Sequence, residues 1–486
     1  MSSTATAPPI SQPERAVRFG VALVLVAQLM VVLDAAVVNV ALPRIAADLD
    51  FAPAALTWVL NGYTLAFGGL LLLGGRIGDV FGRRRTLVAG LVAFTLFSLA
   101  GGLAPNAELL VLARAMQGLG AALAAPQVLA LVTTSARDGT ARARAIALFA
   151  AVSSSGASIG LILGGLLTDL GSWRWTLFIN VPIGLAVLSL VRRYVPETSR
   201  RPGRFDVAGA VTATGGAVAI VWSLIGASQH GWTSARTVGG IVLGIALLAA
   251  LVLVERRVAH PLLRLELFRS PRRVMSFVAI VGLVGAQFST FYLTVLYLQG
   301  VLHFGPLASG FAFLPLSLSI FGMSRISPRI AARIGMPAML LVGGIGMTLS
   351  FVWLSQLGAN ASYAGAMLVP FVINGAFASM VFTASTALGL EGVDAAHAGA
   401  ASGLVQTMQQ LGGSIGLAII ASVYVANGHP GEIVPGMRQA FTAAALLATI
   451  GVIAALTTVL RGRVRRLRRS ARAPQYAVAR AAAEVD

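Results

Sequence analysis

The chain contains no cysteine and no lysine among its 486 residues. The absence of cysteine excludes disulfide bonds, thiolate metal sites and catalysis by a thiol. The absence of lysine excludes a Walker A loop, whose lysine binds nucleotide phosphates, so an ATP-driven pump of that type is not encoded in this polypeptide. All 36 basic residues are therefore arginine, and the formal net charge is +19.

Charged residues are also scarce. They make up 11% of the chain, against 57% hydrophobic residues and a mean hydropathy of +0.84. The apolar runs have the length of about 20 residues that a helix needs to span a bilayer, and none alternates as the strands of a membrane barrel do. We therefore predict an all-α polytopic membrane protein with about 14 transmembrane helices.

The arginines lie in short loops between the apolar runs, which argues against a nucleic-acid-binding face. Most fall on the side of the N-terminus, in clusters at residues 83–85, 137–144, 192–204, 256–273, 325–333 and 461–472; the opposite side has only Arg44, Arg174, Arg236 and Arg438. By the positive-inside rule we expect both termini in the cytoplasm. All six tryptophans fall at or near the opposite ends of the helices, as an interfacial belt would.

The two ends of the chain are polar. Residues 1–18 lead directly into a full-length span, so we expect a cytoplasmic tail and no cleavable signal peptide. Residues 461–486 form a basic tail, in which the run Arg461–Arg469 follows the last span. We expect this tail to contact anionic lipid headgroups, at about 1 kcal/mol for each arginine near the surface.

Two short patterns recur at about the same distance along the chain. Gly75–Arg85 is echoed by Pro328–Gly335, and Ser158–Leu161 is echoed by Ser414–Leu417. Self-similarity at one offset indicates an internal repeat. We predict two six-helix pseudo-repeat bundles, at residues 19–193 and 275–460, with an inserted helix pair at residues 206–255.

Asp34 lies in the middle of the first apolar run. A carboxylate at the centre of a spanning helix costs about 2.5–3.5 kcal/mol on insertion scales, so such residues usually face a bundle interior and have a function. Arg114 is the other charge that we place inside the bundle. Burial disfavours the ionised carboxylate and a nearby guanidinium favours it, so an acid held between these effects can bind and release a proton. A purely structural ion pair is the alternative.

The arginine-rich segment after the second span carries glycines at positions 75, 78 and 82 together with one acid, Asp79. We expect a tight turn that brings two helix ends together, in which Asp79 caps a neighbouring helix or pairs with one of Arg83–Arg85. Gly75, Asp79, Gly82, Arg83 and Arg84 are therefore our candidates for a gating loop. A simple topology-setting loop is the alternative.

The same segment resembles the loop signature of the major facilitator superfamily. Further similar stretches narrow the resemblance to its fourteen-helix drug:proton antiporter branch, the multidrug and quaternary-ammonium exporters; they lie at residues 33–43, 112–118, 173–184, 205–206, 261–269 and 403–413. The resemblance covers the chain except its tails. It implies that Asp34 and Asn39 are the polar pair of the first-helix motif and that Arg114 is linked with proton transfer.

The chain departs from the family pattern at two positions. Val80 stands where the loop signature usually has arginine, and Leu161 stands where the fifth-helix motif has proline. We expect Arg83 or Arg84 to replace the missing arginine, and the fifth helix to be straighter than usual because proline is the commonest cause of a kink.

Candidate substrate contacts are the neutral polar and aromatic side chains of the spans, because an amide that faces lipid is costly. In the N-terminal half they are Gln28, Asn39 and Gln117; in the C-terminal half they are Gln287, Phe288, Phe291, Tyr292, Asn374, Phe377, Gln406 and Gln410. For any single aromatic residue, packing is the alternative.

We expect a proton-coupled antiporter that exports hydrophobic, neutral or monocationic small molecules across a bacterial cytoplasmic membrane by alternating access. It would need no metal and no cofactor beyond the proton gradient, would not be an enzyme, and would act as a monomer. Treating Asp34 as the single intramembrane carboxylate, we expect about one coupled proton. Two alternatives stay open: a dedicated exporter of one endogenous antibiotic, siderophore or lipid, and a membrane receptor or scaffold that does not transport.

Overall fold

The computed structural model describes residues 14–134, 139–198, 206–258, 265–359, 361–393, 398–428 and 432–483. Parts of three predicted arginine clusters lie outside these residues, at 137–138, 199–204 and 259–264, as does most of the N-terminal tail. Fourteen helices of the described residues are long and apolar enough to span a membrane, which confirms the predicted number.

The N-terminal half contains six spans. They are α1 (Glu14–Asp48), α2 (Trp58–Phe81), preceded by the short turn η1 (Ala55–Thr57), α3 (Arg83–Gly102), α4 (Ala107–Thr134), α5 (Gly139–Leu170), and α6 (Trp175–Phe178) with α7 (Asn180–Tyr194) as one interrupted span. Helix α4 packs on α2 and α3, and α1 packs on α5. The approach of α4 to α2 requires a glycine at position 118, because a Cβ there would lie 2.3 Å from the carbonyl oxygen of Tyr63.

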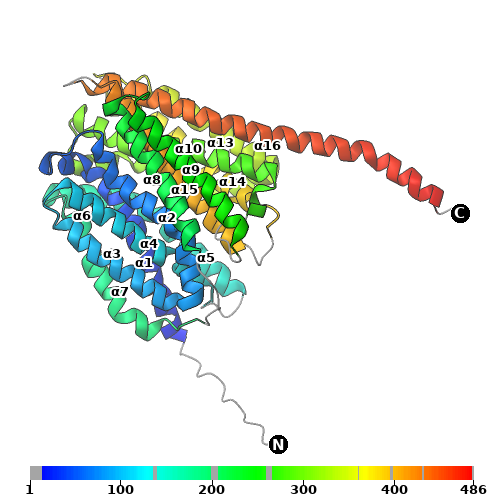
Figure 1. Cartoon of the computed structure of the whole chain (residues 1–486), viewed down its shortest axis with the longest axis horizontal. Coiled ribbons are helices and arrows are strands. Elements are labelled where there is room, and N and C mark those ends of the chain that lie inside the picture. Colours follow the sequence, from blue (N-terminus) through cyan, green and yellow to red (C-terminus); the bar gives the residue numbers. More distant parts are fainter. Residues whose placement is uncertain are drawn as a thin grey trace, which may run out of the picture.

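The C-terminal half also contains six spans. They are α10 (Pro271–Gly300), preceded by η2 (Leu265–Phe268), α11 (Pro306–Ala312) with α12 (Leu314–Ile334), α13 (Met336–Leu354), the π-helical turn η3 (Ala364–Leu368) leading into α14 (Val369–Leu390), α15 (Ala398–Ala426) and α16 (Ile433–Ala483). The span Pro306–Ile334 is interrupted at Phe313, two residues before Pro315 in the first turn of α12. Figure 1 shows the two halves grouped on opposite sides of the molecule.

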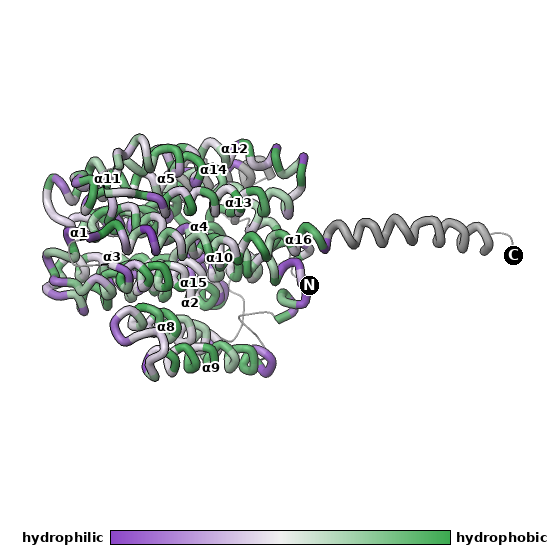
Figure 2. Tube along the Cα trace, turned by 90° about the horizontal axis from the view of Figure 1, so that it is seen from above, coloured by the Kyte–Doolittle hydropathy of each residue, from purple (hydrophilic) through white to green (hydrophobic). Residues whose placement is uncertain are grey.

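The inserted pair consists of α8 (Val207–His230) and α9 (Ala235–Arg257), which pack on each other beside the two halves (Figure 2). Helix α8 contacts α2 of the N-terminal half and α15 of the C-terminal half. On the α15 side, the hydroxyl of Ser422 donates a hydrogen bond to the carbonyl oxygen of Leu224. The inserted pair is therefore attached to both halves.

The bundle has two ends, which we name by their residues. The arginine face holds the connections that carry the arginine clusters, and the tryptophan face holds the helix ends near Trp58, Trp173, Trp232 and Trp353. The halves approach closely near the tryptophan face, where Gln299 Nε2 of α10 donates to the carbonyl oxygen of Val40 in α1 at 2.9 Å. A Cβ on Gly310 of α11 would lie 2.6 Å from the carbonyl oxygen of Leu161 in α5.

Candidate functional site

Asp34 and Arg114 form an ion pair inside the N-terminal half. The residues lie in α1 and α4, each is 1% exposed, and Arg114 Nη1 donates to Asp34 Oδ2 at 2.5 Å. Removing two charges from water is costly, and their attraction compensates only when the remaining donors and acceptors are also satisfied. The surroundings of the pair therefore decide whether it can persist.

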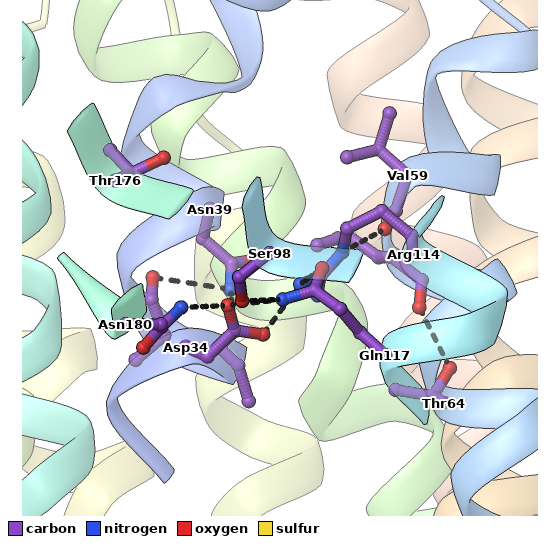
Figure 3. Close-up of polar contacts among 12 residues, drawn as sticks. Asp34, Asn39, Val59, Thr64, Ser98, Arg114, Gln117, Thr176 and Asn180 are labelled. Atoms are coloured by element: carbon purple, nitrogen blue, oxygen red, sulfur yellow. Dashed lines mark hydrogen bonds and ion pairs between the residues drawn. The ribbon is translucent and has the colours of Figure 1, made fainter. Parts of the chain in front are cut away.

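The second carboxylate oxygen of Asp34 has two amide partners. Oδ1 accepts from Asn180 Nδ2 at 2.8 Å and from Gln117 Nε2 at 3.2 Å. Gln117 also accepts from Arg114 Nη1 at 3.1 Å through Oε1, and its Nε2 donates to Ser98 Oγ at 2.5 Å. Figure 3 shows Asp34 between Asn180 on one side and Gln117 with Arg114 on the other. The acid thus joins α1 to α4 and α7, and Gln117 extends the network to α3.

The guanidinium of Arg114 has partners apart from Asp34. Its Nε donates to the carbonyl oxygen of Val59 at 3.1 Å, and its Cζ lies 4.5 Å from the ring centre of Tyr63. A cation over an aromatic face is attracted by about 2 kcal/mol when both are desolvated. Arg114 would therefore keep three partners, Val59, Gln117 and Tyr63, if the carboxylate lost its charge.

Two predicted substrate contacts of α1 make hydrogen bonds to residues other than Asp34. Asn39 Nδ2 donates to the carbonyl oxygen of Ala35 in its own helix at 2.8 Å, and Gln28 Nε2 donates to Ser153 Oγ of α5 at 3.2 Å. The structure therefore brings Asp34 together with Arg114 and Gln117. Neither Asn39 nor Gln28 is among the hydrogen-bond partners of Asp34 in the described residues.

Three of the predicted contacts in the C-terminal half are buried. Gln287 is 3% exposed, and neither its Oε1 nor its Nε2 has a hydrogen-bond partner among the described residues. Asn374 Nδ2 of α14 donates to Ser350 Oγ of α13 at 2.8 Å, while its Oδ1 has no such partner. Tyr292 is 1% exposed. The two buried amides thus leave hydrogen-bonding capacity unused.

The other predicted contacts are dispersed. Phe288 packs against α15 at Gly413, and Phe291 stacks on Phe313 at 5.6 Å between ring centres. Phe377 lines an apolar groove of about 410 Å³ between α13 and α14. Gln406 is exposed, and Gln410 lies against Gly68 of α2, where the halves meet.

The predicted gating loop is shorter than expected. Helix α2 continues to Phe81, so Gly75 and Asp79 are helical and the turn consists of Gly82 alone, with φ +106°. Asp79 Oδ1 pairs with Arg83 Nη2 at 3.2 Å. A Cβ on Gly75 would make only an ordinary contact at 3.8 Å, so a close approach does not require this glycine.

Glu197 and Thr198, rather than Asp79, cap the start of α3. The carboxylate of Glu197 accepts from the backbone N–H groups of Arg84 and Arg85 at 3.0 and 3.2 Å, and Thr198 Oγ1 accepts from that of Arg83 at 3.3 Å. This cap could not be predicted from local pattern, because Glu197 follows a proline beyond the end of α7. The cap ties the turn at Gly82 to the end of the sixth span.

Asp34 is not the only buried carboxylate among the described residues. Asp206 and Glu255, at the ends of α8 and α9, are 3% and 5% exposed. Asp206 Oδ1 accepts from the backbone N–H of Gly209 at 2.7 Å, and oxygens of both acids lie within 3 Å of the position of a Cβ on Gly209. Both acids stand at the limits of apolar runs, where hydropathy windows end, so the sequence did not indicate their burial. Among the described residues, no group of three or more His, Asp or Glu is placed to hold a metal ion.

The chain is similar in sequence to known transport and resistance proteins. The sequence profile of the Major Facilitator Superfamily matches residues 24–417. The puromycin resistance protein pur8 of Streptomyces alboniger is 40% identical over 91% of this chain and 90% of its own length. The cephamycin export protein CmcT of Amycolatopsis lactamdurans is 38% identical over 89% and 90%. The tetracenomycin C resistance and export protein of Streptomyces glaucescens is 34% identical over 82% and 74%.

Solved structures show the same fold at much lower identity. The POT family transporter PepTSo aligns with a TM-score of 0.67 and 15% identity over 94% of this chain and 99% of that chain. The nucleoside transporter NupG aligns with a TM-score of 0.62 and 12% identity over 91% and 99%. At these identities the likeness shows the fold alone.

Proposed function

Because this chain belongs to the Major Facilitator Superfamily and its relatives are antibiotic export and resistance proteins, we propose that it is a proton-coupled antiporter. It exports hydrophobic, neutral or monocationic small molecules across the cytoplasmic membrane, with both termini in the cytoplasm. The observation that carries this proposal is the buried Asp34–Arg114 pair, a titratable acid held among four helices in a spanning segment.

The hydrogen bonds of Asp34 suggest how a proton would act. A proton on the carboxylate removes its attraction for Arg114 and turns one oxygen from an acceptor into a donor. Asn180 and Gln117 both donate to Asp34, so protonation weakens the bonds that join α1 to α4 and α7. Arg114 stays in place through Val59 and Tyr63. The proton therefore loosens the packing of α1 while the cation remains fixed.

The neutral side chains of α10 supply candidate groups for the cargo. Gln287, Thr290 and Thr294 stand at i, i+3 and i+7, so they share one helix face, and all three have unpartnered polar atoms among the described residues. A buried polar group without a partner costs about 1–3 kcal/mol in proteins. Hydrogen-bonding groups of a cargo molecule would remove that cost, and a neutral site suits neutral or singly charged molecules.

A dedicated exporter of one endogenous metabolite is the second candidate. It is favoured by relatives whose names describe the export of single antibiotics, cephamycin and tetracenomycin C. Both candidates use the same Asp34 chemistry and differ only in substrate range. A panel of puromycin, lincomycin, tetracenomycin C and ethidium separates them, because a dedicated exporter transports at most one member.

A transport assay in proteoliposomes tests the proposal. With an imposed pH gradient, the wild-type protein should accumulate a panel compound, and Asp34→Asn should abolish accumulation. The matched control is Asp48→Asn, which removes a half-exposed acid at the end of the same helix, where it pairs with Arg174. Accumulation that is independent of the gradient, or retained in Asp34→Asn, would exclude proton coupling through this acid. A transport-inactive receptor would accumulate nothing even in wild type.

A further inference from the structure

A small pocket lies at the tryptophan face, between the inserted pair and the N-terminal half. Trp58 at the start of α2 and Trp222 of α8 form its walls, and its polar groups include Gln229, His230 and Arg236. The cavity volume is about 120 Å³. This volume accommodates several water molecules and therefore a phosphate group.

The guanidinium of Arg236 is held by Trp222 and His230, but it has no acidic partner among the described residues. Its Cζ lies 4.5 Å from the ring centre of Trp222, and its Nη1 donates to His230 Nε2 at 3.0 Å. His230 Nδ1 must then carry the ring proton and donates to the carbonyl oxygen of Gly226 at 3.1 Å. No acidic side chain of the described residues pairs with Arg236. The pocket therefore presents an ordered positive charge with unused N–H donors.

The surroundings of the pocket have the composition expected at a bilayer interface. Only 11% of the most apolar window of α9 is buried inside the protein, and Figure 2 shows this helix at the outer edge of the molecule, so we expect most of it to face lipid. Trp222 and Trp232 are 42% and 44% exposed, and tryptophan concentrates at the level of the lipid headgroups. The charge of Arg236 therefore lies beside lipid headgroups, away from the interior of the bundle.

We propose that this pocket binds the phosphate of an anionic phospholipid in the leaflet at the tryptophan face. A planar guanidinium with several free donors matches phosphate geometry, and the weakly hydrated cation tolerates the two indole walls. The bound lipid would join the start of α2 to α8 and α9. Because α8 also contacts α15, the lipid would fix the inserted pair where the two halves meet.

Melting of the full-length protein in detergent tests this site. Phosphatidylglycerol, phosphatidylcholine or inorganic phosphate is added to wild type, Arg236→Gln and Arg44→Gln. The control removes an exposed arginine of the same face that does not line the pocket. We expect phosphatidylglycerol to raise the melting temperature of wild type and Arg44→Gln more than phosphatidylcholine does, and Arg236→Gln to lose this difference.

Two results would overturn the assignment. An equal response of wild type and Arg236→Gln to phosphatidylglycerol would mean that the lipid binds elsewhere, for example at the basic tail. A rise produced by inorganic phosphate alone, and lost in Arg236→Gln, would indicate a small-anion site. If Arg236→Gln does not fold, Arg236→Lys serves instead. It keeps the charge but loses the planar fork, so its response should be smaller than that of wild type, and an undiminished response would contradict the proposal.

Discussion

The centres of the two halves carry corresponding positions with different chemistry. Asp34 and Gln287 are the same number of residues apart as Gly82 and Gly335, the positive-φ glycines before α3 and α13. In the N-terminal half the acid makes hydrogen bonds through both oxygens, whereas in the C-terminal half the amide makes none among the described residues. The first centre is charged, and its acid has partners on both oxygens; the second centre is neutral, and its amide has none among the described residues.

The neutral framework around these positions is repeated as well. Gln117 of α4 donates to Ser98 of α3, and Asn374 of α14 donates to Ser350 of α13. In the part of the C-terminal half that the structure describes, no buried ion pair corresponds to Asp34–Arg114. The comparison suggests a division of labour, in which the first half responds to the proton and the second offers hydrogen bonds to the cargo.

The largest effect is expected from Asp34→Asn. The amide keeps the size of the side chain but cannot exchange a proton near neutral pH, so gradient-driven accumulation in proteoliposomes should fall to background. Asn180 and Gln117 retain an oxygen acceptor, so the protein should still fold, which its elution as a single species checks. Gln287→Glu, which adds an acid to the second centre, should not restore transport to Asp34→Asn; restoration would show that the halves are interchangeable.

Arg114→Gln should be the most destabilising of these substitutions. Removing one partner of a buried ion pair costs about 3–5 kcal/mol, because the other charge remains buried and uncompensated. Thermal unfolding in detergent should show a large decrease in melting temperature. The double variant Asp34→Asn with Arg114→Gln should recover part of this loss, and additive losses would contradict coupling between the two residues.

Gln287→Leu should affect stability in the opposite direction. Replacing an unpartnered buried amide with an apolar side chain of similar size removes a cost of about 1–3 kcal/mol. We expect a higher melting temperature together with weaker transport of the best panel compound. Asn374→Leu breaks the bond to Ser350 and serves as the contrast, since it should lower the melting temperature. A Gln287→Leu protein that is less stable and transports normally would refute the division of labour.

Glu197→Gln should have the smallest effect. The amide oxygen can still accept from one backbone N–H at the start of α3, but the charge that faces the helix dipole is lost, at a cost of about 0.5–2 kcal/mol. The melting temperature should fall modestly. The control Glu432→Gln changes an acid near the opposite face and should leave the melting temperature unchanged. Equal decreases in both variants would show that the cap at Glu197 makes no specific contribution to stability.

The sequence was sufficient for features that depend on local composition. Apolar windows predicted the fourteen spans, and the cost of a charge in lipid identified Asp34 and Arg114 as residues to be buried together. The partners Asn180 and Ser98 could not be predicted, because their contacts depend on how α7 and α3 are rotated against α1 and α4. Tyr63 was missed for the same reason, since an aromatic residue in an apolar run gives no sign of a cation above its ring.

The errors concern helix ends. Windows end at charged residues by construction, so they could not show that Asp206 and Glu255 are buried or that α2 continues through Gly75 and Asp79. The interruption at Phe313 depends on packing of α11 against α5, which involves residues distant in sequence. Local patterns therefore gave the spans, whereas the assembly of the bundle determined the contacts.

Proton release on cargo binding tests the central claim most directly. The purified protein in weakly buffered detergent solution is mixed with the panel compound that the wild type transports best, and a pH-sensitive dye records the proton balance. In a proton antiporter the cargo and the proton exclude each other, so wild type and Asp48→Asn should release protons on binding, whereas Asp34→Asn should bind the compound without release. Equal proton release from wild type and Asp34→Asn would contradict the account, because the exchanged proton would then belong to another group.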